Sequence, residues 1–200
     1  MKRTVWAIGW LLVTAAATAQ GLLALDAVEI IVYSFEGSPE GWEIPDWAKA
    51  SDDYVGREVV VSGDVATDGA SSLKLETTFP ADRWTGGYVE RQLEVTDWSP
   101  FGRLSVGVYL PPQAPEGLTG RLILTIGEQW EWVEMNRAAP LQPGAWTSIA
   151  VNLKPGSMDW KFFPDERFRK DVRKLGVRIE SNHASAYSGP VYIDRVCLAE

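Results

Sequence analysis

The chain has 200 residues and a formal net charge of −8, which gives enough length for one domain with a sizeable core and an acidic balance that disfavours a nucleic-acid partner. Cys197 is its only cysteine and His183 its only histidine, which excludes an internal disulfide and a multi-histidine metal site. Eight of the ten tryptophans follow residue 19, which is more than one small core usually takes, so we expect some to be buried and others to form exposed platforms for a flat ligand.

The N-terminal segment has the three parts of a secretory signal peptide. Lys2 and Arg3 give it a positive start, residues 5–13 are apolar, and Ala17-Thr18-Ala19 matches a small-residue cleavage pattern with Gln20 as the new N-terminus. We therefore expect a protein that is secreted, periplasmic or held at the cell surface.

Cleavage would leave residues 1–19 as the signal peptide and residues 20–200 as a single domain with no membrane insertion. The alternative is an uncleaved membrane anchor, because apolar residues resume at Leu22, Leu23 and Leu25. The central apolar run is short for a membrane span of about 20 residues. Cleavage is therefore the favoured interpretation.

Short strand-like runs alternate with Gly and Pro turns along the rest of the chain. Asp68-Gly69, Gly127-Glu128 and Pro143-Gly144 are clear turn signals. Many short strands of this kind predict an all-β fold, a β-sandwich (jelly roll) of two antiparallel sheets. In chain order the runs are Val28–Phe35, Glu58–Ser62, Ser72–Thr77, Tyr88–Val95, Leu104–Leu110, Arg121–Ile126, Gln129–Met135, Trp146–Leu153, Leu175–Glu180 and Val191–Leu198.

The longest irregular connection is Pro155–Lys170. Its aromatic residues, among them Trp160 and Phe168, predict that it packs onto the domain as a lid or loop. The best helical candidate is Asp165–Lys174, which is short and strongly charged. Cys197 lies in an apolar strand pattern and is expected to be a buried small hydrophobe.

Trp130 and Trp132 are two residues apart, so on a strand their side chains share one face, which Glu134 continues. Val133 and Met135 then lie on the core side. Two large rings beside a carboxylate suit a sugar, because rings stack on the apolar faces of pyranoses and carboxylates accept hydroxyl protons. The alternative reverses the strand and places both rings in the core.

Arg178 and Glu180 share one face of their strand, and Val177 and Ile179 occupy the other. Their face is expected to lie toward solvent or a cleft. Beside an aromatic platform, Arg178 and Glu180 would hydrogen-bond sugar hydroxyls, whereas the alternative is a solvated salt-bridging surface.

Trp47 and Trp84 occur in polar, loop-like contexts and are further candidates for a binding cleft. Trp42, Trp98 and Trp146 are instead expected to have packing roles. Trp42 follows Gly41, Trp98 lies in a turn, and Trp146 begins a strand.

Four groups of motifs, in their order along the chain, cover nearly all of it after the signal peptide. They are Phe35-Glu36-Gly37 with Gly41-Trp42; Asp68–Leu75; Ile126–Trp132 with Leu141–Thr147; and Leu175–Glu180 with Gly189–Val196. In this order the chain resembles the jelly-roll carbohydrate-binding modules of bacterial mannanases and cellulases, within the galactose-binding-like superfamily.

The resemblance implies a structural calcium site. The matching positions are Glu36, the turn from Gly69 to Ser72, and Asp194 of the last strand. Calcium takes six to eight oxygen ligands, among which carboxylates and backbone carbonyls are common. The alternative is that Asp194 pairs with a nearby base, such as Arg195, or with a backbone amide.

The resemblance also implies a secreted, monomeric, non-catalytic module that binds a β-linked plant-type or envelope polysaccharide, mannan-like or glucan-like, by aromatic stacking. One alternative is a small β-sandwich glycoside hydrolase or lyase, which needs two carboxylates flanking the bond. The chain contains neither a Glu-x-Asp-x-x-Glu run nor a Gly-x-Ser-x-Gly elbow. A protein-binding envelope domain is the other alternative, because a fold does not fix a function.

Overall fold

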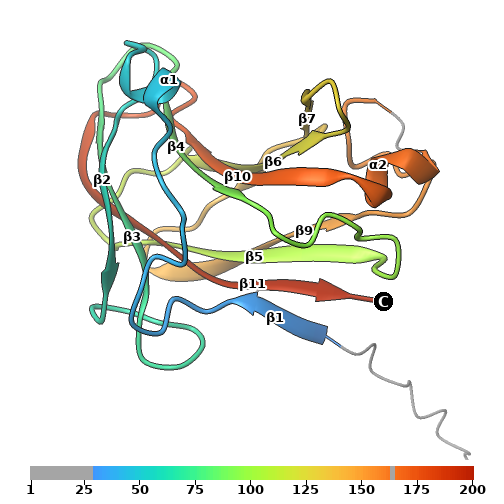
Figure 1. The fold of residues 1–200 in the computed structure, drawn as a ribbon. Helices are drawn as coiled ribbons and strands as arrows, with labels where there is room; N and C mark the ends of the chain where they lie inside the picture. Colours follow the sequence, from blue (N-terminus) through green and yellow to red (C-terminus); the bar gives the residue numbers. More distant parts are fainter. Residues whose placement is uncertain (1–28, 163–164) are drawn as a thin grey trace, which may run out of the picture.

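The computed structural model describes residues 29–162 and 165–200, which form a β-sandwich of two antiparallel sheets (Figure 1). The proposed signal peptide lies outside these residues. The elements are β1 (Glu29–Tyr33), α1 (Asp46–Lys49), β2 (Gly56–Ser62), β3 (Ser72–Phe79), β4 (Gly86–Gln92), β5 (Arg103–Leu110), β6 (Thr119–Ile126), β7 (Glu131–Glu134), β8 (Ala139–Pro140), β9 (Ala145–Asn152), α2 (Glu166–Lys170), β10 (Val172–Glu180) and β11 (Tyr187–Ala199).

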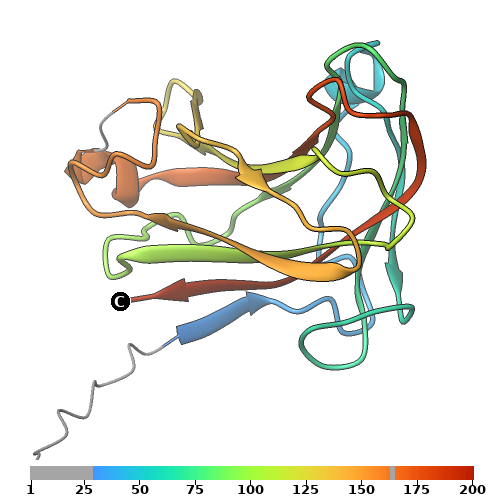
Figure 2. The ribbon, with the colours of Figure 1, turned by 180° about the vertical axis from the view of Figure 1, so that it is seen from behind.

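The first sheet has the strand order β2-β3-β11-β5-β9, and β1 also pairs with β11. The second sheet has the order β4-β10-β6-β7, and β8 also pairs with β6. Figure 1 shows the two layers with β10 and β6 above β5 and β11, and Figure 2 shows β9 beside β5 from behind. The predicted all-β sandwich is therefore confirmed.

The core lies between the sheets, and strand alternation builds it. In β10, Leu175, Val177 and Ile179 are fully buried, and their partner residues in β6 include Leu122 and Leu124, also fully buried. Every second residue of such strands points inward, so the period-2 apolar pattern becomes one inner face. Each buried aliphatic side chain contributes roughly 1.5–3 kcal/mol to the free energy of unfolding.

The predicted strands are confirmed with shifts of a few residues at their ends, with one consequential exception. The run Gln129–Met135 was expected as one strand, but β7 begins only at Glu131. Trp130 lies in the β6–β7 turn with a positive φ of 54°. A residue in this left-handed conformation cannot continue a strand, so Trp130 and Trp132 do not share a strand face.

The predicted helix Asp165–Lys174 is shorter than expected. Asp165 caps α2 by accepting hydrogen bonds from the amides of Arg167 and Phe168, but the helix ends at Lys170. Residues from Val172 onward pair with β6, because their alternating apolar side chains complete the second sheet. The short helix α1 was not predicted, since four residues carry too little periodicity.

The described residues of the connection between β9 and α2 pack onto the domain, as predicted. Trp160 and Phe168 are buried, with ring centroids 5.3 Å apart. The amide of Lys161 donates to the carbonyl of Glu134 (3.0 Å), and the amide of Asn136 donates to the carbonyl of Asp159 (2.6 Å). These bonds cover the outer edge of β7, which would otherwise present unpaired backbone groups.

Cys197 is buried in β11, as its apolar strand pattern predicted. Among the described residues, no helix is long and apolar enough to cross a membrane.

Candidate binding face

The outward side of the second sheet, here called the polar face, carries charged and aromatic side chains. Residues that pair across antiparallel strands point to the same side of a sheet. Arg178 lies opposite Tyr88 of β4 and Arg121 of β6, and Glu180 lies opposite Thr119. Trp132 and Glu134 of β7 continue this side, because Trp132 pairs with Thr125 and the intervening Val133 is fully buried.

Five rings form an aromatic cluster over the polar face: Trp47, Tyr54, Trp84, Tyr88 and Trp132. Tyr88 lies at its centre, with ring centroids 5.1 Å from Trp47 and 5.6 Å from Trp132. Trp47 contacts Trp132 at 5.8 Å, and Tyr54 contacts Trp84 at 6.1 Å. Distances of this size are those of offset and edge-to-face aromatic pairs.

The two tryptophans at the surface of the aromatic cluster rest on a buried ring. Trp47 is 42% exposed and Trp132 is 40% exposed, whereas Tyr88 is completely buried. The planes of Trp47 and Trp132 meet at 80°, so the two rings form an open corner. A large exposed apolar surface held by a packed base is typical of a binding site rather than of a core.

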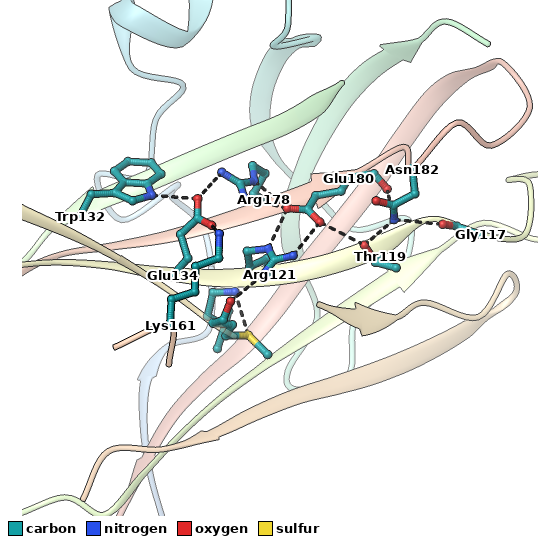
Figure 3. A network of polar contacts seen from close by, with 11 residues as sticks. Gly117, Thr119, Arg121, Trp132, Glu134, Lys161, Arg178, Glu180 and Asn182 are labelled. Carbon is teal, nitrogen blue, oxygen red and sulfur yellow. Dashed lines mark hydrogen bonds and ion pairs between the residues drawn. The ribbon is translucent and has the colours of Figure 1, made fainter. Parts of the chain in front are cut away.

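An ion network lies beside the aromatic cluster (Figure 3). The guanidinium of Arg178 donates to Glu134 Oε1 at 2.9 Å and to Glu180 Oε1 at 2.7 Å. Arg121 donates to the same Glu180 oxygen at 2.8 Å and to the carbonyl of Met135 at 2.5 Å. Lys161 pairs with Glu134. Each carboxylate therefore has two cationic partners.

Two charged residues at the centre of the ion network are buried. Arg178 is 6% exposed and Glu180 is 3% exposed. The expected alternative of a solvated salt-bridging surface is therefore wrong for this pair, because neighbouring side chains cover it. Trp84 contributes to that cover, with its ring centroid 5.5 Å from the Arg178 guanidinium carbon. This cation–π contact joins the ion network to the aromatic cluster.

The carboxylates of the ion network have lowered pKa values. Burial alone would raise the pKa of Glu134, but hydrogen bonds from Lys161, Trp132 and Arg178 outweigh it and lower the pKa to about 2. Burial opposes the same change at Glu180, where hydrogen bonds from Arg121 and Arg178 lower the pKa. Both groups are thus ionised at neutral pH, whereas a glycosidase acid must hold a proton there.

A second ion pair, between Lys174 and Glu90, lies at the end of the polar face away from Glu180. Lys174 pairs with Glu90 at 2.5 Å, and the Tyr88 hydroxyl donates to the same carboxylate at 3.0 Å. The Trp130 ring lies over Arg173 and Lys174, at 5.2 Å and 5.9 Å. Trp130 is 47% exposed, so it contributes a separate aromatic surface near this end of the face.

The structure thus brings together five of the six predicted ligand-binding residues: Trp47, Trp84, Trp132, Arg178 and Glu180. Trp130 lies apart, in the turn. Sequence reasoning missed Tyr54, Tyr88, Arg121 and Lys174 as members of the face. Tyr88 and Lys174 occupy outward positions of strands that alternate, which was the available signal.

The tryptophans outside the aromatic cluster, within residues 29–162, also have clear places. Trp42 and Trp98 are 2% and 3% exposed, which confirms their predicted packing roles. Trp146 is half-buried and lies on β9 of the first sheet.

The four residues of the expected calcium site lie together. Their carboxylates, however, accept hydrogen bonds from backbone amides, whereas a calcium site would need carboxylate and carbonyl oxygens that face a common point. Asp194 Oδ2 accepts from the amides of Thr67 (2.7 Å) and Asp68 (3.0 Å), and Oδ1 accepts from the amide of Arg195. Glu36 Oε1 accepts from the amides of Ala70 and Ser71, both at 3.0 Å.

Glu36 and Asp194 therefore hold the Thr67–Ser71 turn from two sides, through amide hydrogens. The Ser72 hydroxyl is also engaged, since it donates to the carbonyl of Val65 at 2.6 Å. Gly69 has a φ of +62° and a side chain there would collide with Glu36, so the turn requires glycine. Among the described residues, no three His, Cys, Asp or Glu side chains form a metal-binding group.

As arranged, this donor set does not fit a cation, because amide hydrogens instead of carbonyl oxygens face both carboxylates. The geometry matches the alternative in which Asp194 binds backbone amides. Calcium stays a prediction of the resemblance.

No protein-family model matches the chain, and no curated protein matches it. Solved structures do. The mannohexaose complex of CBM27-1 from Caldicellulosiruptor saccharolyticus superposes with a TM-score of 0.60 at 18% identity, over 86% of this chain and 97% of that one. A CBM28 module specific for non-crystalline cellulose has a TM-score of 0.64 at 14% identity, over 86% of this chain and 94% of that one.

The family 11 module of a cellulosomal cellulase from Clostridium thermocellum is a third match, with a TM-score of 0.53 at 14% identity, over 86% of this chain and 95% of that one. At these identities the similarity shows the fold. The chain has the jelly-roll β-sandwich of the carbohydrate-binding modules, which confirms the resemblance inferred from its motifs.

Proposed function

We propose that this chain is a non-catalytic module that binds a neutral β-linked polysaccharide, mannan-like or glucan-like, on the polar face of its second sheet. The observation that carries the proposal is the corner formed by the exposed rings of Trp47 and Trp132. The matched modules solved with mannohexaose or specific for non-crystalline cellulose support the ligand class.

The corner suits a sugar chain. Each ring offers an apolar plane on which a pyranose stacks, and the 80° between the planes lets one ring contact a sugar from below while the other contacts its side. The Trp132 indole nitrogen donates to Glu134 at 2.9 Å, which fixes the ring before a ligand arrives.

The charges on the polar face favour a neutral ligand. Arg178 is paired with Glu134 and Glu180, and Lys174 is paired with Glu90. A uronic-acid carboxylate would have to displace one of these internal partners, at the cost of leaving a buried carboxylate unpaired. Sugar hydroxyls, by contrast, can form hydrogen bonds with side chains at the edge of the ion network without displacing any of these internal partners.

The lowered pKa values of Glu134 and Glu180 support binding over hydrolysis, since neither carboxyl holds a proton for a leaving group at neutral pH. We further propose that the domain acts outside the cytoplasm as a monomer, after removal of residues 1–19. The N-terminal sequence supports this location.

The test titrates the purified protein with glucomannan, β-mannan and β-glucan oligosaccharides, following tryptophan fluorescence and the release of reducing ends. We expect a saturable fluorescence change and no reducing ends. Release of reducing ends would identify a hydrolase and overturn the proposal. No fluorescence change with any of the three, together with no retardation in affinity electrophoresis, would favour a protein-binding domain.

A further inference from the structure

A second row of aromatic rings lies on the outward side of the first sheet. Tyr192 of β11 pairs with Tyr109 of β5, and Tyr109 pairs with Trp146 of β9. The ring centroids are 6.1 Å apart for the tyrosines and 5.5 Å apart for Tyr109 and Trp146. The three residues therefore form one continuous row across β11, β5 and β9. These three strands lie side by side in the lower layer of Figure 2.

The row is anchored at one end and open at the other. Tyr192 is buried, and its hydroxyl bonds Asp64 at 3.0 Å while Lys74 lies over its ring. Tyr109 and Trp146 are only half-buried. The accessible aromatic surface is thus at the Trp146 end, and its position is fixed by the packed rings behind it.

A cavity of about 130 Å³ lies beside Trp146. The residues that line it are Thr67, Ser105, Gly107, Trp146, Thr147, Ser148 and Arg195. The side chains of Ser105 and Ser148 lie on the same outward side of the sheet as Trp146, whereas Thr147 pairs with the buried Val108 and points to the core side. Pockets for whole small molecules usually measure about 300–1,000 Å³. This cavity therefore accommodates the hydroxyl-bearing edge of one sugar ring rather than a length of polysaccharide.

The wall of the cavity is held in place by contacts described above. Thr67 belongs to the turn that Asp194 and Glu36 hold through backbone amides. Gly107 forms the floor, where a Cβ atom would lie 3.0 Å from the carbonyl of Asp194. Arg195 is paired with Glu29 at 2.6 Å, so the single cation at the rim is neutralised.

We propose that this row and cavity are a second glycan-binding site, which takes one neutral pyranose. The sugar stacks its apolar face on Trp146, and its hydroxyls exchange hydrogen bonds with Ser105 and Ser148, whose side chains share the outward side with Trp146. The site is separate from the polar face, because the two lie on opposite outward sides of the sandwich. It does not depend on the function proposed for the polar face.

The experiment labels the protein with fluorotryptophan, assigns each fluorine resonance by single Trp→Phe variants, and titrates mannohexaose and cellohexaose to about 10 mM, which detects Kd values in the millimolar range. We expect the Trp146 resonance to shift in a saturable way. The shift should persist in Trp132→Ala, which removes part of the polar-face corner.

Two serine variants test the cavity. Ser148 is exposed, so Ser148→Phe fills the cavity without disturbing the core and should weaken the Trp146 response at least roughly tenfold. Ser188→Phe is the matched control, since Ser188 is an exposed serine of the same sheet that does not line the cavity. Its Trp146 response should equal that of the unaltered protein.

The outcomes distinguish the two sites. A shift at Trp132 without one at Trp146 overturns the second site and leaves the proposed function standing. A shift at Trp146 that Ser148→Phe does not weaken also overturns it. A shift at Trp146 without one at Trp132 supports the second site and contradicts the proposed function of the polar face.

Discussion

Trp132 and Arg178 share a single acceptor atom, Oε1 of Glu134. The Trp132 indole nitrogen and the Arg178 guanidinium each donate to that oxygen at 2.9 Å. The exposed ring that we propose as a sugar platform is thereby connected to an ion network whose central residues, Arg178 and Glu180, are buried. Its orientation is determined by charge pairing inside the protein and not only by neighbouring rings.

The first prediction concerns the stability supplied by Arg178. Arg178→Met should lower the free energy of unfolding by about 3–5 kcal/mol, because it leaves the buried carboxylate of Glu180 and the half-buried carboxylate of Glu134 without a principal partner. Urea denaturation measures the change. Lys49→Met is the control, since Lys49 is paired with the exposed Asp46, and it should have no measurable effect. Equal stability of the two variants would contradict the account of the network.

The second prediction concerns acid stability. The pKa of Glu134 falls from its ordinary value of 4.5 to about 2 on folding, so its ionised form favours the folded state. That contribution is complete above about pH 4.5 and is lost as the pH falls toward 2. In Glu134→Gln the free energy of unfolding should therefore decline less steeply over this range than in the unaltered protein, as measured by urea denaturation at a series of pH values. Parallel declines would exclude a depressed pKa at this residue.

The third prediction concerns calcium. The amide hydrogen bonds at Glu36 and Asp194 predict that a chelator leaves the melting temperature unchanged, whereas Asp194→Asn should lower the free energy of unfolding by about 1–3 kcal/mol. Differential scanning calorimetry measures both effects. A lower melting temperature with the chelator, restored by added calcium, would support the site that the resemblance implied.

The fourth prediction concerns salt. Binding of a neutral oligosaccharide should have the same Kd at about 0.05 M and about 1 M salt, because the charges of the polar face are paired within the protein. Titration calorimetry at the two concentrations checks this. A Kd that rises steeply with salt would indicate that the protein recognises a charged ligand.

Local alternation predicted much of the site. The buried Val133 between Trp132 and Glu134 fixes which side of β7 is outward, and Val177 and Ile179 do the same for Arg178 and Glu180. These pairs were therefore placed correctly on one face. The burial of Arg178 and Glu180 was not predictable, because the ring of Trp84, which covers Arg178, comes from a loop far away in the sequence.

The expectations for Trp130 and Asp194 depended on backbone conformation and on tertiary contacts, which the local sequence pattern does not reveal. Trp130 was placed on a strand because it lies two residues before Trp132. In the structure Trp130 has a positive φ and belongs to the turn in which the chain reverses between β6 and β7. For Asp194, the residue type indicates only that an oxygen ligand is available. Whether amide hydrogens or a cation face that oxygen depends on how the turn at Thr67 folds against it.

The most direct test of the central claim is a calorimetric titration of mannohexaose and a mixed-linked β-glucan tetrasaccharide into the unaltered protein, Trp132→Ala and Phe162→Ala. Phe162 is exposed to a similar degree but lies outside the aromatic cluster. We expect Trp132→Ala to weaken binding by about 10- to 100-fold, or about 1.4–2.8 kcal/mol, and Phe162→Ala to leave it unchanged. Equal affinities of Trp132→Ala and the unaltered protein would contradict the claim that the polar face binds the glycan.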